Sequence, residues 1–131
     1  MTTPQVRPFL MFQGEAEAAL TTYVALIPGS EILELARFGV GEPGEGQVKR
    51  AVVSIAGQLV LAIDSPVQHA FTFTPAFSFF VDCADEPELD RIWTALEPGG
   101  SVLMPLAAYG FSRRFGWLND RFGVSWQLNL P

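Results

Sequence analysis

Residues 15–29 read EAEAALTTYVALIPG, and this stretch decides the first half of the fold. Its apolar side chains recur at intervals of three and four, which is typical of a helix with one buried face. They are Ala16, Ala19, Leu20, Tyr23, Val24 and Ile27. Pro28-Gly29 ends the pattern, because proline cannot continue a helix and glycine tolerates the left-handed turn that follows one. We therefore predict an amphipathic helix over residues 15–27.

A second stretch of the same kind covers residues 86–100, EPELDRIWTALEPGG. Its apolar face is formed by Leu89, Ile92, Trp93 and Leu96. Asp85 precedes the helix as an N-cap, and Glu88 stands three positions later, as in a capping box. Pro98-Gly99 repeats the helix-ending signal 70 positions after Pro28-Gly29. This pattern predicts a second helix over Glu86–Leu96.

The remaining apolar segments predict β-strands, because they are short, rich in branched and aromatic residues, and bounded by turn residues. They cover residues 6–12, 31–38, 48–55, 59–63, 76–81, 117–119 and 124–130. Ala56-Gly57 and residues 120–123 predict hairpin turns. Residues 31–38 also fit a helical spacing, but their position after a helix-ending Pro-Gly favours a strand with a bulge. Pro8 favours an edge position for the first strand.

The predicted elements repeat. The helices start at Glu15 and Glu86, 71 positions apart, and the hairpin glycines Gly57 and Gly123 are 66 apart. A nearly constant offset indicates two copies of one unit. We predict an α+β fold of two βαβββ modules, residues 6–64 and 75–131, joined by a linker over residues 65–74. One helix can cover only one face of a four-stranded sheet, so the other faces must pack together, curve around a cleft or bind a partner.

The composition narrows the function classes. The 131 residues are 49% hydrophobic and 17% charged, which suits a folded domain and leaves apolar surface that a homodimer would bury. The net charge of −6 makes nucleic acid a poor partner. The longest apolar run, residues 59–63, is too short to cross a bilayer, and no basic-then-apolar leader follows Met1. We expect a cytoplasmic protein without a membrane or nucleic-acid partner.

Several stretches resemble the vicinal oxygen chelate superfamily, which includes glyoxalases, bleomycin-resistance proteins and dioxygenases. Within it they are similar to the PhnB-like group, often described as a 3-demethylubiquinone-9 3-methyltransferase domain. The stretches are PFLMFQGEAEAA (8–19), LIPGS (26–30), FTPAFSFFV (73–81), Gly99-Gly100 with Met104-Pro105-Leu106, and FGWLNDRFGVSWQ (115–127). The resemblance covers essentially the whole chain and departs from the family at Thr22, where an aromatic residue is usual. It implies paired modules around a cleft and a homodimer.

The resemblance also implies where a metal would be bound. Enzymes of the superfamily hold a divalent ion with side chains from the first and last strands of each module, and the corresponding positions here are Arg7, Leu61, Ala76 and Gln127. Divalent ions need several nitrogen or oxygen donors. Arginine has no free lone pair, and leucine and alanine have no donor. We therefore expect no metal and no cofactor at these positions.

The methyltransferase description receives no support from sequence motifs. Residues 39–44 match the G-x-G-x-x-G pattern of nucleotide-binding loops. However, no predicted helix follows, Pro43 interrupts the loop, and Glu42 and Glu45 would repel a phosphate. We interpret this segment as a surface loop.

Inward-facing positions of the modules predict a small-molecule pocket. The final strand alternates apolar residues with Ser125, Gln127 and Asn129, so one face packs on a helix and the other is polar. By the repeat, the residues that line the same cavity as Gln127 are Arg7, Phe9, Met11, Ala76, Ser78 and Phe80. The resemblance adds Leu61 as a pocket candidate, and Trp117 and Arg113 are candidates because they lie at the strand that would border the cleft mouth. A guanidinium buried without a partner costs several kcal/mol. Arg7 should therefore reach solvent, pair with a carboxylate or bind an anionic ligand.

We interpret the other reactive side chains as structural rather than catalytic residues. Cys83 with His69 would form a nucleophile pair, but a lone cysteine at the end of a buried strand is typical of a core residue. We expect His69 to be a solvated linker residue. Asp64 and Asp120 are assigned to turns, where aspartate accepts hydrogen bonds from its own backbone.

The leading hypothesis is a metal-free protein that binds a small anionic or aromatic molecule in the cleft without converting it. Two alternatives stay open. One is a metal-independent enzyme of the same superfamily, in which Arg7, Gln127 or Ser78 polarises a substrate. The other is a drug-sequestering protein of the bleomycin-resistance type. The sequence nominates no catalytic residue and does not identify the ligand.

Overall fold

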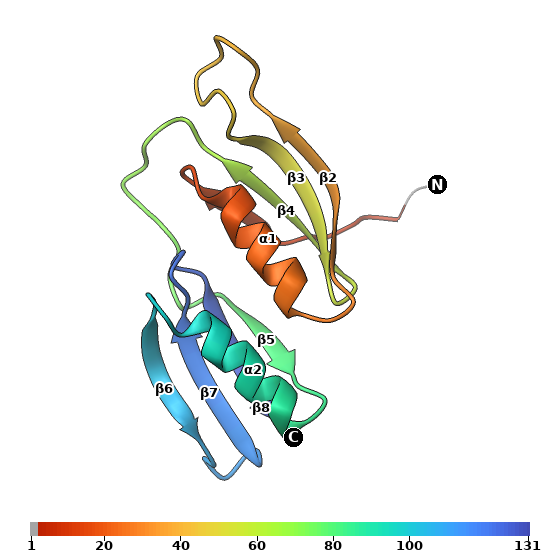
Figure 1. The fold of residues 1–131 in the computed structure, drawn as a ribbon, viewed down its shortest axis with the longest axis vertical. Helices are drawn as coiled ribbons and strands as arrows, with labels where there is room; N and C mark the ends of the chain where they lie inside the picture. Colours follow the sequence, from red (N-terminus) through yellow and green to blue (C-terminus); the bar gives the residue numbers. More distant parts are fainter. Residues whose placement is uncertain (1–2) are drawn as a thin grey trace. The chain divides into compact units, whose positions relative to one another are not determined.

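The computed structural model describes residues 3–131, and the chain forms two compact units, Met1–Ala70 and Phe71–Pro131. The first unit contains β1 (Phe9–Phe12), α1 (Ala16–Leu26), β2 (Glu31–Arg37), β3 (Val48–Ile55) and β4 (Gln58–Asp64). The second contains β5 (Ser78–Asp82), α2 (Glu86–Leu96), β6 (Ser101–Ala107), β7 (Arg114–Asn119) and β8 (Ser125–Leu130) (Figure 1). The predicted α+β fold of two βαβββ modules is confirmed.

The two sheets have the same topology. The strand order is β1-β4-β3-β2 in the first and β5-β8-β7-β6 in the second. In each sheet the first strand runs parallel to the last, and the other neighbours are antiparallel. Phe9 lies opposite Leu61 in one parallel pair, and Ser78 lies opposite Ser125 in the other. The sheets are therefore mixed, and β1 is an edge strand, as Pro8 predicted.

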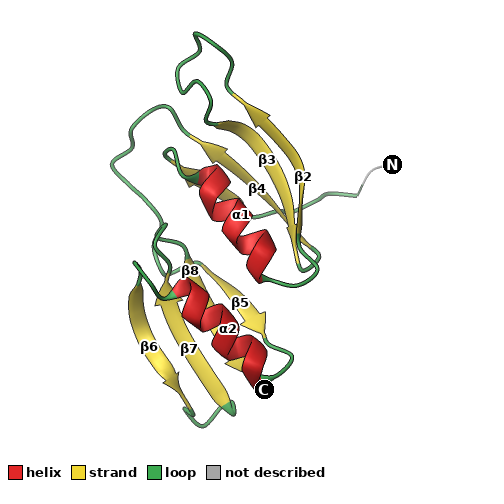
Figure 2. Cartoon of the chain, viewed as in Figure 1, coloured by secondary structure: helices red, strands yellow, loops and turns green. Residues whose placement is uncertain are grey.

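In each unit the helix lies against one face of the sheet (Figure 2). The side chains between helix and sheet are at most 3% exposed; they include Leu10, Phe12, Leu20, Tyr23, Val53 and Val60 in the first unit, and Leu89, Ile92, Leu118, Trp126 and Leu128 in the second. Burial of these apolar side chains is the main stabilising contribution to each unit. Within the described part of the chain, the helix of each unit covers only one face of the sheet of that unit; the face that this helix leaves uncovered is called the open face below.

The ends of several strands differ from the prediction. Strand β1 begins at Phe9 rather than at residue 6, because Pro8 has no N–H and only its carbonyl joins the sheet, accepting from Leu61 N at 2.9 Å. Strand β5 begins at Ser78, because a turn in which Phe77 N donates to Thr74 O precedes it. Strand β7 begins three residues earlier than predicted, at Arg114.

The local signals within the units are confirmed. The segment after the first helix is a strand, with a register shift between Ile32 and Glu34. Ala56 and Gly57 have φ angles of 48° and 93°, as a tight hairpin turn requires. Asp85 Oδ1 accepts from Glu88 N at 2.9 Å, and the Glu88 carboxylate accepts in return from Ala84 N at 3.0 Å.

The interpretation of Asp64 as a turn residue is wrong. Its carboxylate accepts backbone N–H groups from Gly14, Ala16 and Val48, at 2.8, 2.9 and 2.9 Å. Asp64 thus provides the cap for α1, since Glu15 makes no side-chain cap of its own. Asp120 does stabilise its own turn, because its carboxylate accepts from the N–H groups of residues 122 and 124.

Candidate functional site

The open face of the second sheet carries a connected group of polar side chains at its centre. Ser125 Oγ lies 2.6 Å from Ser78 Oγ, and it also accepts a hydrogen bond from Trp117 Nε1 at 2.8 Å. Ser78 and Trp117, both predicted site residues, are therefore joined through Ser125. The alternation of β8 placed Ser125 on this face, but no sequence pattern indicated that Ser125 bridges the two neighbouring strands.

Gln127 lies next along the same strand. In the sheet register it stands opposite Phe80 of β5 on one side and Trp117 of β7 on the other. Its side chain is half-buried and makes no hydrogen bond to any other residue between 3 and 131. An amide has both donors and acceptors, so this group is available to a ligand.

Asn129, the next polar residue of β8 after Gln127, has its side-chain hydrogen bonds satisfied by other residues of the chain. Asn129 Nδ2 donates to Asp82 Oδ1 at 2.9 Å, and Asn129 Oδ1 accepts from Ser112 Oγ. Hydrogen-bond capacity is thus concentrated at Gln127 rather than spread along β8.

Aromatic rings gather on this side of the second unit. The Phe115 ring lies 6.2 Å from Phe80, 6.1 Å from Tyr109 and 5.0 Å from Phe111, measured between centroids. Phe80 is 55% exposed and Phe111 is 63% exposed. Apolar and aromatic walls with a few directed polar groups are the usual composition of small-molecule sites. The position of Tyr109 and Phe111 in a loop explains why strand periodicity did not predict this cluster.

The open face of the first sheet brings together three other predicted residues, Phe9, Met11 and Leu61. Phe9 and Leu61 face one another across β1 and β4, and Met11 stands opposite Ile63 in the same register. Phe9 and Leu61 help to line a groove of about 290 Å³, whose lining residues are Phe9, Lys49, Arg50, Ala51, Leu61, Ala62 and Ile63.

Three predicted residues lie outside these two groups. Arg7 precedes β1, is half-buried and forms no ion pair with any residue in the described part of the chain. Ala76 is exposed in the turn before β5. Arg113 is also exposed, and its Nε donates to the Pro131 carbonyl at 2.7 Å. Roles for Arg7, Ala76 and Arg113 in ligand binding stay predictions.

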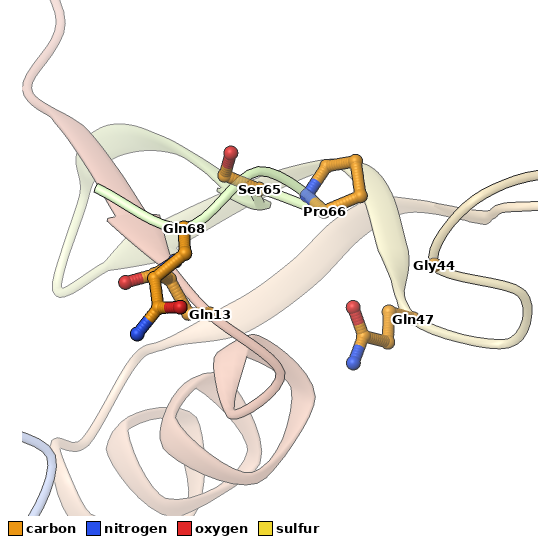
Figure 3. Close-up of a pocket in the computed structure, with 6 residues that line it drawn as sticks. All are labelled: Gln13, Gly44, Gln47, Ser65, Pro66 and Gln68. Atoms are coloured by element: carbon orange, nitrogen blue, oxygen red, sulfur yellow. The ribbon is translucent and has the colours of Figure 1, made fainter.

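A polar hollow of about 470 Å³ in the first unit was not predicted (Figure 3). Its lining residues are Gln13, Gly44, Gln47, Ser65, Pro66 and Gln68. Beside it, His69 is half-buried, and its Nε2 lies 2.9 Å from Ser65 Oγ. His69 thus lies in the linker, as expected, but it is half-buried and in contact with Ser65 rather than fully solvated.

Cys83 is a core residue, as predicted, with 4% of its surface exposed. Burial raises the pKa of its thiol from 9.0 to about 11, and the negative charge of Glu88 adds to the effect. At pH 8 the thiolate fraction should be roughly one in a thousand, against roughly one in ten for an ordinary thiol. We expect iodoacetamide to alkylate native Cys83 at least about a hundredfold more slowly than guanidinium-denatured Cys83. Equal rates would show that native Cys83 is accessible to the reagent and that its pKa is not raised.

The side chains at the positions implied for a metal do not fit one. Arg7, Leu61 and Ala76 supply no lone pair for a divalent ion, and Gln127 alone cannot hold it. Nor do residues 3–131 contain a group of three or more His, Cys, Asp or Glu side chains arranged to bind a metal.

The glycine-rich loop at residues 39–44 does not suit phosphate. Glu42 Oε1 accepts from Gly39 N at 2.8 Å, and Glu45 Oε1 accepts from Gly41 N at 3.0 Å. Two backbone donors that a phosphate would need are thus occupied by carboxylates of the same loop.

Comparison with known proteins places the chain in a family. The model of the family described as 3-demethylubiquinone-9 3-methyltransferase matches residues 4–129. The PhnB protein from Bacillus cereus, described as a candidate enzyme of that name, is 47% identical; the match covers 98% of this chain and 100% of that one, with a TM-score of 0.94. Protein PA1353 from Pseudomonas aeruginosa is 28% identical over 98% of each chain, with a TM-score of 0.85.

A more distant likeness concerns the fold alone. The fosfomycin resistance protein FosX from Listeria monocytogenes, in a complex with Mn(II), is 13% identical with a TM-score of 0.63, over 100% of this chain and 94% of that one. No curated protein matches the chain by sequence. No helix among residues 3–131 is long and apolar enough to cross a membrane. The chain belongs to the family described as 3-demethylubiquinone-9 3-methyltransferase and is PhnB-like.

Proposed function

We propose that this protein binds a small organic molecule on the open faces of its sheets without using a metal, and that the open face of the second sheet takes an aromatic ring with a hydrogen-bonding substituent. The observation that carries the proposal is the unpaired amide of Gln127 between two aromatic residues, Phe80 and Trp117. A ring stacked against such residues gains from apolar contact, and the amide fixes its orientation.

The same face supports binding better than turnover. A general acid or base must reach the reacting proton and titrate near the working pH. The carboxylate of Asp82, on this face, is held by Asn129 Nδ2, and the neighbouring Cys83 is buried and protonated at neutral pH. In these environments neither Asp82 nor Cys83 is suited to proton transfer. The open face of the second sheet therefore offers a ligand hydrogen bonds and apolar contacts.

The second candidate function is the methyl transfer named in the family description. It is favoured by the match over residues 4–129, and a demethylated quinol would suit an aromatic face with an amide donor. The occupied backbone donors of the glycine-rich loop argue against S-adenosylmethionine binding at that loop. A methyltransferase assay with S-adenosylmethionine and a demethylated short-chain quinol separates this candidate from the binding proposal.

We further propose that the protein acts as a homodimer in the cytoplasm. Outside the proposed ligand site, large apolar side chains that a dimer interface would bury are exposed in the single chain, among them Leu33, Phe77, Val102 and Leu103. Native mass spectrometry of the protein as purified measures the mass of the assembly and detects a co-purified organic molecule in the same experiment. A monomer mass would contradict the dimer.

The binding proposal makes a prediction for Gln127. A short-chain ubiquinone analogue should quench tryptophan fluorescence, and Gln127→Ala should weaken its binding about three- to tenfold, the effect of one lost hydrogen bond. Isothermal titration calorimetry gives the affinities.

Gln58→Ala is the matched control, because Gln58 is an exposed glutamine in the first unit whose amide donates only to the adjacent Leu59 carbonyl. This variant should bind like the unchanged protein. If the analogue does not bind, or both variants bind it equally well, the role assigned to Gln127 is incorrect. Methyl transfer to the quinol would instead support the enzyme.

A further inference from the structure

We propose that the groove on the open face of the first sheet binds an amphipathic monoanion, such as a small carboxylate with an apolar body. The inference rests on the proposed function, because it assumes that open sheet faces bind small molecules. It adds a site in the first unit, two residues that the sequence did not nominate, and a class of ligand.

The floor of the groove is apolar. Phe9 lies opposite Leu61 in the parallel pair of β1 and β4, and Ile63 follows on the same side of β4. Phe9 is 55% exposed although it belongs to a regular strand. A groove of about 290 Å³ with these walls would shield the hydrocarbon part of a small ligand from water.

Two cations stand at the same groove, Lys49 and Arg50 of β3. Arg37 of β2 pairs with Val48, whereas Ala36 pairs with Arg50, so Lys49 is an extra residue in a bulge. A bulge changes the direction of a side chain relative to the regular alternation of a strand. This irregularity lets adjacent residues of one strand line the same groove.

The two cations are only partly neutralised. Arg50 Nε lies 3.5 Å from Glu34 Oε2, and both side chains are more than half exposed, so the pair is weak. Lys49 is exposed and forms no ion pair with any residue in the described range. An incoming carboxylate can therefore interact with Lys49 and compete with Glu34 for Arg50.

Charge complementarity selects the ligand class. The chain as a whole carries a net charge of −6, so a positively charged groove is a local exception. A neutral apolar molecule would gain only from the floor, and a cation would be repelled by Lys49 and Arg50. A monoanion with an apolar body can place that body against the apolar floor and its charge near Lys49 and Arg50.

The test uses three probes that share one apolar body: hydrocinnamate, hydrocinnamyl alcohol and phenylpropylammonium. Each is titrated into the isotopically labelled protein while backbone amide shifts are recorded by NMR. Hydrocinnamate should move the amide signals of Phe9, Arg50 and Ile63, and the alcohol and the amine should bind at least about threefold more weakly. Added salt should weaken the binding of hydrocinnamate.

Two variants distinguish the contribution of the positive charge from that of the apolar floor. Lys49→Gln should weaken hydrocinnamate about three- to fivefold and leave the alcohol unchanged, whereas Phe9→Ala should weaken both. Arg37→Gln is the matched control, because Arg37 belongs to the same sheet but pairs with Glu17 of α1 on the covered face; it should bind all three probes normally.

The proposal is overturned if the alcohol binds as tightly as the acid, if Lys49→Gln and Arg37→Gln behave alike, or if millimolar hydrocinnamate causes no shifts in β1, β3 and β4. All three tryptophans, Trp93, Trp117 and Trp126, belong to the second unit. Binding seen by tryptophan fluorescence without shifts in the first unit would reject this inference and leave the proposed function standing.

Discussion

Asp64→Ala is expected to lower the free energy of unfolding by about 3–5 kcal/mol. The carboxylate is 1% exposed and accepts three backbone N–H groups, from Gly14, Ala16 and Val48. Alanine removes all three acceptor contacts at once. Each donor left unsatisfied in the interior costs about 1–3 kcal/mol, and water entering the space offsets part of the total. Urea denaturation followed by circular dichroism measures the change.

Asp85→Ala is the control for this prediction, because it removes the same side chain from an exposed N-cap that accepts only one N–H, from Glu88. Its expected cost is about 1 kcal/mol. Asp64→Asn should fall between the two, since the amide oxygen still accepts while its NH₂ group faces other donors. A cost for Asp64→Ala no larger than that for Asp85→Ala would show that the three hydrogen bonds contribute little to stability.

The fold could be predicted because its signals are local or repeated. Pro28-Gly29 and Pro98-Gly99 end helices through the conformational limits of those residues alone. Ala56-Gly57 selects a hairpin in the same way. The repeat then supplied what local signals did not. Strand β6, which carries Pro105, was not among the segments predicted as strands, and only the four strands that the repeat assigns to the second module implied it.

The role of Asp64 could not be predicted in this way. Its hydrogen-bond partners Gly14 and Ala16 lie 50 and 48 positions away in the chain, so only the parallel pairing of β1 with β4 brings them together. A sequence pattern records which residue types neighbour one another along the chain, and an aspartate after a strand fits a local turn equally well.

The candidate site was predicted only in part, because some of its features also depend on how strands pair. Alternation along β8 predicted that Gln127 lies on the polar face, and the pairing of β7 with β8 brings Trp117 next to it. It did not indicate that Lys49 lines a groove, because this depends on a bulge in the pairing of β2 with β3. Nor did it indicate the ring contacts of Tyr109 and Phe111, which lie in a loop.

Gly116→Ala is expected to lower the free energy of unfolding by about 2–3 kcal/mol. Gly116 lies in β7, and an added Cβ would stand 2.5 Å from Trp93 Cζ3 and 2.7 Å from Leu106 Cδ2. Real Cβ atoms do not approach other atoms so closely, so the indole of α2 or the strand itself must move. Trp93 is buried in the core of its unit, where displacement leaves strained rotamers or voids. Thermal and urea unfolding of the variant measure the loss.

A double-mutant cycle that combines Gly116→Ala with Trp93→Leu tests whether the indole of Trp93 causes this loss of stability. Trp93→Leu alone removes part of a buried ring and should cost about 2–4 kcal/mol through the cavity that it leaves. The double variant should cost at least about 1 kcal/mol less than the two single changes together, because the shorter leucine vacates the space that the new methyl group needs. Additive costs would mean that the indole is not the obstacle, and that the damage arises instead from Leu106 or from the strand backbone at Gly116.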